Sequence, residues 1–298
     1  EAFLWENAQC MDLFGQHWLP PLGMRIRGCV FFHHGIAEHS SRYHEPAVHL
    51  ASKGFLVSAY DAQGHGRSQG LDQCYFRKLG DLIDDSFNFM ETVMKKRALA
   101  AGLTDFKPFI WGQSFGGLIL CRAAELKADG RTGPEFSGLI LTSPALYVNM
   151  DCVMKIQQPL GPCMAAIAPK LRLIAAVAAA DMSRNEETVN DYVADPLNDM
   201  GMLRIKTGVE GDVNMKKARD EFGLLKLPLL IFHGTKDMCT DPRGSQMCFD
   251  GAASEDKSYR QWEGFYHILF GEPDKASVIR ELGEWLENRT IPLNEASG

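Results

Sequence analysis

The feature that most constrains this chain is the stretch from residue 108 to 121, where two apolar runs flank a serine set between glycines. Residues 109–111 are predicted to form a buried strand, and residues 118–126 a helix. Between them, residues 112–116 (Gly-Gln-Ser-Phe-Gly) fit the pattern G-x-S-x-G, which presents a nucleophilic serine, here Ser114, on a sharp strand-to-helix turn. Glycine is needed at Gly112 and Gly116 because side chains there would collide across the turn. An ordinary serine in a glycine-rich turn is the alternative.

The charge balance and the cysteine spacing exclude several classes of partner. The chain has 298 residues and a net charge of −7, and its 31 basic residues are scattered, so no basic face is expected for nucleic acid. Its eight cysteines include no C-x-x-C pair, and no two histidines have the helical spacing of a metal site. We therefore expect no metal, no cofactor and no nucleic-acid partner. Cysteines within apolar runs favour a reducing compartment such as the cytoplasm.

The rest of the chain alternates between short apolar runs and amphipathic stretches. Strands are expected at residues 10–18, 25–32, 55–60, 109–111, 138–142, 227–232 and 258–262, and helices at 42–53, 79–94, 118–126 and 275–288. Apolar strands that alternate with helices form a mostly parallel sheet that is covered on both faces. We therefore predict a fold of the α/β class, with residues 10–18 at the sheet edge.

The alternation breaks between residues 143 and 225, where no strong strand signal occurs. We predict a core formed by residues 1–142 and 226–298, with a helical cap at 143–225 inserted above the carboxyl ends of the strands, where such sheets bind ligands. Few charges occur between residues 156 and 180, so we expect an apolar pocket lining or an exposed apolar patch. The candidate substrate-binding residues are Leu146, Leu160, Met164, Ile167, Leu171, Ile174, Val177 and, beyond the cap, Cys239. Ordinary helix packing is the alternative for most of them.

A nucleophilic serine needs a base and an acid that orients the base, and in such a fold the acid and then the histidine follow the serine along the chain. Asp237 comes soon after the apolar run 229–232 and takes the acid position, with Asp241 as its rival. His267 follows the last predicted strand and takes the position of the base. Backbone N–H groups at Ile36 and Phe115 are our choice for holding an oxyanion.

The other histidines receive no catalytic role. His34 and His65 lie in glycine-rich loops and are expected to fix these loops by hydrogen bonds. His233, although it follows the same apolar run as Asp237, is also left without a role.

Several segments together resemble the monoacylglycerol lipase group of the α/β-hydrolase superfamily, which also holds lysophospholipases and plant caffeoyl-shikimate esterases. The matching segments are HGIAEHS (34–40), DAQGHGRS (61–68), GQSFGG (112–117), DPL (195–197), HGTKD (233–237) and GFYH (264–267). The chain departs from the family at three positions: Ala37 replaces a usual glycine, and Gln113 and Phe115 replace a usual His and Met. Phe115 is bulky and adjoins the nucleophile, so these departures bear on the size of the substrate.

The resemblance implies an α/β-hydrolase fold with a lipid-facing cap, and hydrolysis of monoacylglycerols or similar single-chain lipid esters through an acyl-enzyme on Ser114. A lysophospholipase, a thioesterase or an acyltransferase would use the same residues. An aminopeptidase is less favoured because no acidic group that would bind a free amine is identified, and a non-catalytic protein is disfavoured because all three catalytic positions are filled. Residues 160–180 are too short and interrupted to span a bilayer, and we expect them to lie in its interface as a peripheral contact.

Overall fold

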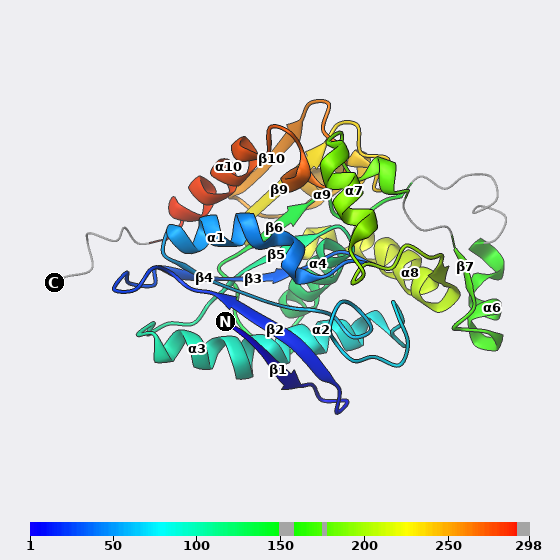
Figure 1. Ribbon diagram of the computed structural model, residues 1–298, viewed down its shortest axis with the longest axis horizontal. Helices are drawn as coiled ribbons and strands as arrows, with labels where there is room; N and C mark the ends of the chain where they lie inside the picture. Colours follow the sequence, from blue (N-terminus) through cyan, green and yellow to red (C-terminus); the bar gives the residue numbers. More distant parts are fainter. Residues whose placement is uncertain (149–157, 175–177, 291–298) are drawn as a thin grey trace.

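The structure is a computed structural model that describes residues 1–148, 158–174 and 178–290. Its centre is an eight-stranded sheet in the order β1-β2-β4-β3-β5-β6-β9-β10 (Figure 1). The strands are β1 (Ala2–Glu6), β2 (Asp12–Trp18), β3 (Gly28–His33), β4 (Phe55–Tyr60), β5 (Phe109–Gln113), β6 (Gly138–Thr142), β9 (Leu229–Gly234) and β10 (Lys257–Trp262). The strands from β4 to β10 pair in parallel, whereas β1 with β2 and β2 with β4 pair antiparallel.

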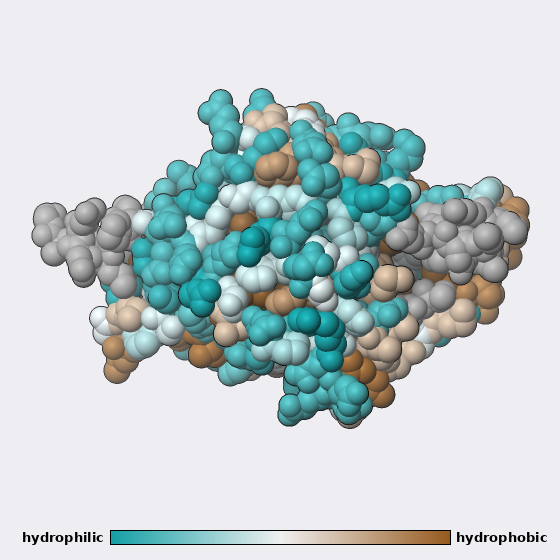
Figure 2. All heavy atoms as spheres, turned by 90° about the horizontal axis from the view of Figure 1, so that it is seen from above, coloured by the Kyte–Doolittle hydropathy of each residue, from teal (hydrophilic) through white to brown (hydrophobic). Residues whose placement is uncertain are grey.

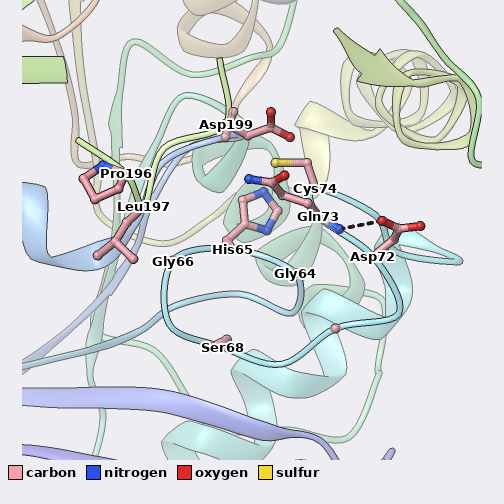
Figure 3. A pocket seen from close by; sticks show the side chains of 12 residues that line it. Gly64, His65, Gly66, Ser68, Asp72, Gln73, Cys74, Pro196, Leu197 and Asp199 are labelled. Carbon is pink, nitrogen blue, oxygen red and sulfur yellow. Dashed lines mark hydrogen bonds between the residues drawn. The ribbon is translucent and has the colours of Figure 1, made fainter. Parts of the chain in front are cut away.

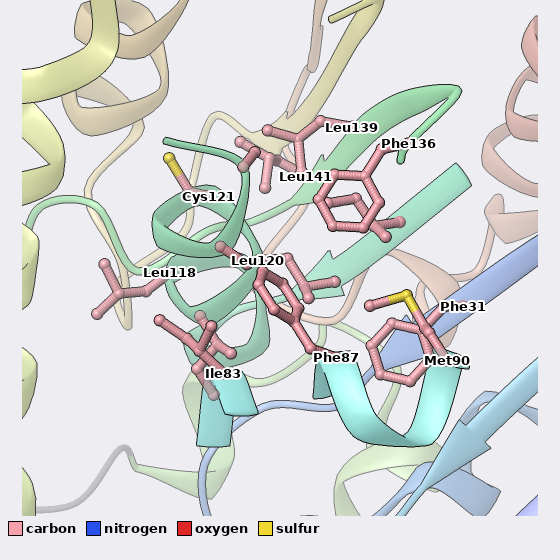
Figure 4. Close-up of a cluster of buried hydrophobic side chains, with 14 of the residues drawn as sticks. Phe31, Ile83, Phe87, Met90, Leu118, Leu120, Cys121, Phe136, Leu139 and Leu141 are labelled. Atoms are coloured by element: carbon pink, nitrogen blue, oxygen red, sulfur yellow. The ribbon is translucent and has the colours of Figure 1, made fainter. Parts of the chain in front are cut away.

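Helices cover both faces of this sheet, as the alternation of the sequence predicts (Figure 1). Helices α1 (His44–Ser52) and α10 (Lys275–Glu287) pack on one face, where their side chains join a cluster with Phe109, Trp111 and Ile140. The other face carries α2 (Leu79–Asn88), the π-helical segment η2 (Phe89–Met94), α3 (Lys95–Ala100), α4 (Phe115–Ala128) and α9 (Pro242–Gly251). Because successive strand residues point to opposite faces, Ile110 and Leu139 belong to this second cluster. Figure 4 shows Leu139 there, near Leu141 and Phe136.

The chain between β6 and β9 contains three α-helices in its described part: α6 (Gly161–Ile167), α7 (Glu186–Ala194) and α8 (Ile205–Glu221). The prediction of a helical insertion is incomplete, because β7 (Arg172–Ile174) pairs with β8 (Leu203–Arg204) in a small antiparallel ribbon. Helix α8 packs on α4, where Arg122 pairs with both Glu125 of α4 and Glu221 of α8. The proposed division into a core (residues 1–142 and 226–298) and an inserted cap (residues 143–225) stays a prediction.

Two further differences from the sequence prediction lie at the edges of elements. Strand β1 was not predicted, and it rather than β2 forms the sheet edge. The helix expected at 79–94 continues to Ala100 through the π-helical segment. None of the helices in the described ranges is both long and apolar enough to cross a membrane.

Candidate active site

Ser114 lies at the junction of β5 and α4, in a backbone conformation (φ 52°, ψ −118°) that is unusual for a residue with a side chain. The surroundings enforce this turn. A Cβ on Gly112 would lie 2.5 Å from the Gly116 carbonyl oxygen, so glycine is required there, as predicted. A Cβ on Gly116 would instead lie 2.2 Å from the His33 carbonyl oxygen. Glycine is needed here because the backbone after β3 lies so close, and not, as predicted, because of a collision across the turn. Strain of this kind persists only where the packing around it is fixed.

The loop after β3 brings a backbone N–H group beside this turn. A Cβ on Gly35 would lie only 3.1 Å from the Cβ of Ser114. Neither the Ile36 N–H nor the Phe115 N–H has a hydrogen-bond partner in the described part of the chain. The Phe115 N–H is the first of α4, so it also carries the positive end of the helix dipole. Two unpaired donors next to a serine are what an oxyanion requires.

Glu38 fixes the loop that carries Ile36. Its Oε1 accepts hydrogen bonds from the Gly35 N–H at 2.7 Å and from the Tyr43 hydroxyl at 2.9 Å. His34 holds the loop from its other side, because its Nε2 accepts from the Ala62 N–H at 2.9 Å. The expected loop-fixing role of His34 is therefore confirmed, whereas the role of Glu38 was missed.

Asp237 and His267, the predicted acid and base, meet at the carboxyl ends of β9 and β10. The Oδ2 atom of Asp237 lies 2.7 Å from His267 Nδ1, and both side chains are buried. Asp241, the rival, instead accepts a hydrogen bond from the Arg243 N–H and caps the N-terminus of α9. Geometry thus places Asp237, and not Asp241, against His267.

Each member of this pair changes the pKa of the other. Burial on its own would raise the pKa of Asp237, but its contacts with His267 and His233 outweigh burial and hold this pKa far below that of an ordinary carboxyl. For His267, burial lowers the pKa, yet the charge of Asp237 and the hydrogen bond to it prevail and raise the pKa above its usual value. An ionised Asp237 therefore faces an imidazole whose protonated form it stabilises.

Sequence reasoning missed two neighbours that complete the surroundings of Asp237. The Thr240 hydroxyl donates to Oδ2 at 3.0 Å, and the Thr240 N–H donates to Oδ1 at the same distance. His233, which is completely buried, places Nε2 at 3.1 Å from Oδ2. The only signal in the sequence is that His233 lies four residues before the acid, at the end of a buried strand.

The proposed substrate-binding residues have very different environments. Leu146 is completely buried in the core, whereas Leu160, Ile167 and Leu171 are 57%, 86% and 52% exposed. Met164 and Ile174 are half-buried, and Val177 lies outside the described residues. The space-filling view shows hydrophobic side chains gathered at the end of the molecule that carries the inserted segment (Figure 2). Residues 160–174 do not form one helix, because α6 ends at Ile167 and β7 follows.

Cys239 lies beside the acid and the base. Ligand atoms of Asp237, Cys239 and His267 are within 4.8 Å of one another, the spacing of a metal site, although two of the three are hydrogen-bonded together. The thiol packs against a small cluster formed by Met182, Tyr192 and Ile268. Burial, together with the charge of Asp237, raises the pKa of the Cys239 thiol, so it is protonated at neutral pH.

Comparisons with known proteins agree with this geometry. Residues 24–274 match the model of a hydrolase family described as serine aminopeptidase, S33. Human monoglyceride lipase is 29% identical over 294 residues, which cover 98% of this chain and 92% of that protein. A monoacylglycerol lipase of Mycolicibacterium smegmatis is 31% identical over 266 residues, which cover 87% of this chain and 88% of that protein.

A solved structure is similar over nearly the same length. The crystal structure of a monoacylglycerol lipase from Paleococcus ferrophilus has a TM-score of 0.79 at 29% identity, and the match covers 93% of this chain and 99% of that one. The eight-stranded, mostly parallel sheet with helices on both faces thus has a known fold. The chain therefore belongs to the hydrolase family whose model it matches, within the α/β-hydrolases. It is a serine ester hydrolase similar to the monoacylglycerol lipases.

Proposed function

We propose that this chain hydrolyses monoacylglycerols, or closely similar single-chain lipid esters, to a fatty acid and an alcohol. The observation that carries the proposal is the 2.7 Å contact between Asp237 and His267, with the amide of Gln113, the residue before Ser114, 3.4 Å from the His267 carbonyl oxygen. The relatives named above, which act on monoacylglycerols according to their names, support the choice of substrate.

In this mechanism the Ser114 hydroxyl attacks the ester carbonyl while His267 Nε2 accepts the hydroxyl proton. Asp237 keeps the other proton on Nδ1 and stabilises the imidazolium, which explains why its carboxylate must stay ionised. The N–H groups of Ile36 and Phe115 bind the oxyanion of the tetrahedral intermediate. His267 then returns the proton to the departing glycerol oxygen, and water, activated by the same imidazole, releases the fatty acid from Ser114.

An enzyme with the same three residues could catalyse other reactions, and each of them can be distinguished from monoacylglycerol hydrolysis by experiment. An acyltransferase would pass the acyl group to an added alcohol, and a lysophospholipase or thioesterase would prefer a different leaving group on the same acyl chain. An aminopeptidase would cleave the amide bond that follows a residue with a free N-terminal amine. A panel of monoacylglycerols, lysophospholipids, acyl thioesters and aminoacyl amides, each measured with and without an alcohol acceptor, separates these activities.

We further propose that the inserted segment contacts the membrane in which such a substrate dissolves. Ile167 and Leu171 are exposed on this segment, and Lys170 between them is a cation suited to lipid headgroups. Ile174 differs, because it packs on α8: a Cβ on Gly208 would lie 2.1 Å from its Cδ1. Placement of the enzyme in a reducing compartment, peripheral to membranes, belongs to the same proposal.

The experiment that tests the catalytic assignment is labelling with a fluorophosphonate probe, followed by assay of Ser114→Ala. We expect the probe to modify Ser114, and the variant to lose about 10⁶-fold in turnover with its fold intact. A folded variant that keeps more than about one per cent of the wild-type turnover would overturn the assignment, because about 10⁶-fold is expected for a lost nucleophile. Efficient hydrolysis of lysophospholipid but not of monoacylglycerol would instead overturn the choice of substrate.

A further inference from the structure

Residues 195–199 directly follow α7 and begin with the Asp-Pro-Leu motif, to which the mechanism above gives no role. We call them the DPL segment, and we call residues 34–40, which carry the Ile36 N–H, the oxyanion loop. Both contribute to the lining of one cavity of about 310 Å³, the loop with Ala37 and the segment with Pro196, Leu197 and Asp199. Figure 3 shows these three residues of the segment in the wall of the cavity. The inserted region thus lies against the loop that carries an oxyanion donor.

Asp195 binds the far end of the oxyanion loop. Its Oδ2 atom accepts hydrogen bonds of 2.9 Å from His39 Nε2 and from Arg42, which lies in the turn η1 (Ser40–Tyr43) directly after the loop. Burial alone would raise the pKa of Asp195, but the hydrogen bonds from His39 and its other donors outweigh burial and lower this pKa, so the carboxylate is ionised. The His39 side chain is only 5% exposed. A charge-assisted hydrogen bond that is shielded from water in this way holds its two partners firmly.

Asp199 binds the middle of the loop through its backbone. Its N–H donates to the Ala37 carbonyl oxygen at 2.9 Å. The carboxylate of Asp199 is fixed in turn, because it accepts from Arg172 of β7 at 2.6 Å and from the Gly201 N–H at 2.9 Å. The donor to Ala37 is therefore held in place by contacts within the inserted region.

Ala37 has a backbone conformation that needs such support. Its φ of 64° lies in the left-handed region, which is costly for a residue with a Cβ and persists only where the surroundings impose it. Relaxation of Ala37 to an ordinary φ would displace the chain just before it, and the Ile36 N–H lies there. The geometry of this oxyanion donor thus depends on what keeps Ala37 in place.

The core by itself leaves the centre of the oxyanion loop free. Glu38 and His34 fix its neighbouring parts, as described above. Of the backbone N–H and C=O groups of Ile36 and Ala37, the Ala37 carbonyl alone has a backbone hydrogen-bond partner within the described ranges. That partner, Asp199, belongs to the DPL segment. The position of the Ile36 donor therefore depends on the inserted region as well as on the core.

We propose that Asp195 is a positioning residue for the oxyanion hole. By binding His39 it holds the oxyanion loop against the DPL segment, where Asp199 keeps Ala37 in its strained conformation. The Ile36 N–H then points to the place where the oxyanion forms. Asp195 does not touch the substrate in this role. Because the oxyanion exists only in the transition state and the intermediate, loss of Asp195 should lower kcat and leave KM nearly unchanged. The proposal rests on the serine hydrolase mechanism given above.

The test compares Asp195→Ala with Asp191→Ala as a matched control. Asp191 of α7 binds the same Arg42, at 3.0 Å, but its side chain is 73% exposed, and such surface pairs contribute little. Both variants are assayed on a short soluble ester, with circular dichroism as a control for folding. We expect Asp195→Ala to lose about ten- to a hundredfold in kcat, because a displaced donor costs less than the 10²–10³ of a donor removed outright. Asp191→Ala should keep the wild-type kcat.

A second readout is specific to the oxyanion. In a thionoester, sulfur replaces the carbonyl oxygen, and sulfur is a weak hydrogen-bond acceptor, so the N–H groups favour the oxygen ester. We expect the ratio of ester to thionoester hydrolysis to fall about tenfold in Asp195→Ala, in line with the loss in kcat. His39→Leu should give the same fall, whereas His39→Gln, which keeps a donor at the place of Nε2, should retain the wild-type ratio.

The outcomes separate this role from others. A lower kcat with an unchanged ratio in Asp195→Ala would show a merely structural role and overturn the proposal. Wild-type kcat in both Asp195→Ala and His39→Leu would overturn it too, and would leave the assignment of Ser114 untouched. If Asp195→Ala does not fold, His39→Leu and His39→Gln decide the question by themselves. Since all these assays use soluble esters, a preference for a lipid other than monoacylglycerol would change the proposed substrate and leave this test intact.

Discussion

The Ser143 hydroxyl donates a hydrogen bond of 2.8 Å to the backbone carbonyl oxygen of His267, across 124 positions of the chain. The Gln113 amide reaches the same oxygen at 3.4 Å, at the limit of a hydrogen bond. Ser143 in turn follows β6 directly, and its carbonyl oxygen lies 3.1 Å from the Thr240 hydroxyl oxygen. The base is thus positioned by its own backbone as well as by Asp237.

We expect Ser143→Ala to lower kcat about tenfold and stability by about 1 kcal/mol, because one well-formed buried hydrogen bond is lost. Gln113→Leu is the matched control. It removes the weaker bond together with a buried amide oxygen that has no partner in the described ranges, so stability should not fall. The measurements are urea unfolding and kcat on a soluble ester. A larger loss in Gln113→Leu than in Ser143→Ala would contradict this ranking.

Asn at Asp237 should lower kcat by about 10⁴, because the imidazole then adopts the wrong tautomer. Asn at Asp241 should cost far less, since Asp241 caps α9 and a capping change affects stability by about 0.5–2 kcal/mol. Both variants are assayed on the same ester, with circular dichroism as a control for folding. If Asp241→Asn does the greater damage to kcat, the acid has been misassigned.

The pH profile of kcat/KM should rise with pH through a midpoint above the usual imidazole pKa of about 6.5, because His267 acts as a neutral base and its pKa is raised. Asp237→Glu, which keeps the charge, should retain a raised midpoint, whereas Asp237→Asn should lower it. Stability depends on pH in the opposite direction: kcat/KM rises with pH, whereas the stability contributed by His267 falls. A raised folded-state pKa contributes stability that is full below about pH 6.5 and is lost as pH rises through the folded value. A midpoint below 6 in the wild type would contradict the pairing.

Cys239 should make the enzyme sensitive to bulky thiol reagents, because the thiol lies beside Asp237 and His267. Since its pKa is raised, we expect slow inactivation by maleimide that accelerates as pH increases. Cys239→Ala should be resistant, while replacement of the exposed Cys163 should change nothing. Equal inactivation of the wild type and Cys239→Ala would remove this idea.

Replacing Ile167 and Leu171 by serine should weaken liposome binding by about tenfold or more, if each side chain loses about 1 kcal/mol of apolar contact with lipid. Hydrolysis of long-chain monoacylglycerol should slow, and short soluble esters should be little affected. Ile174→Ser is the control from the same segment: it should lower Tm and affect both substrates, because Ile174 packs on α8. Unchanged liposome binding in the stable double variant would exclude these residues as the contact.

Local sequence patterns were sufficient to predict those site residues whose place depends on one strand and the loop that follows it. The turn at Ser114 and the placement of Asp237 after a buried strand needed only the apolar runs and the glycines, whereas β10, the strand before His267, is a sheet edge with Trp262 as its one buried residue. His233 and Thr240 could not be predicted, because their contacts with Asp237 depend on how the loop after β9 folds back on itself. Strands β7 and β8 are too short to show any periodicity, and Ala2–Glu6 has too few buried positions.

The order of the sheet also determines when activity can arise as the chain folds. Ser114 follows β5, Asp237 follows β9 and His267 follows β10, so the three come together only after β9 has paired with β6 and β10 with β9. The β6–β9 pairing joins segments separated by the whole inserted region, so we expect it to close late, and β10 can add only after β9 is in place. Helices α1 to α4 can therefore form, and circular dichroism can recover, while the refolding enzyme is still inert. Return of esterase activity reports completion of the last strand, and a kinetic lag between the two signals measures that step.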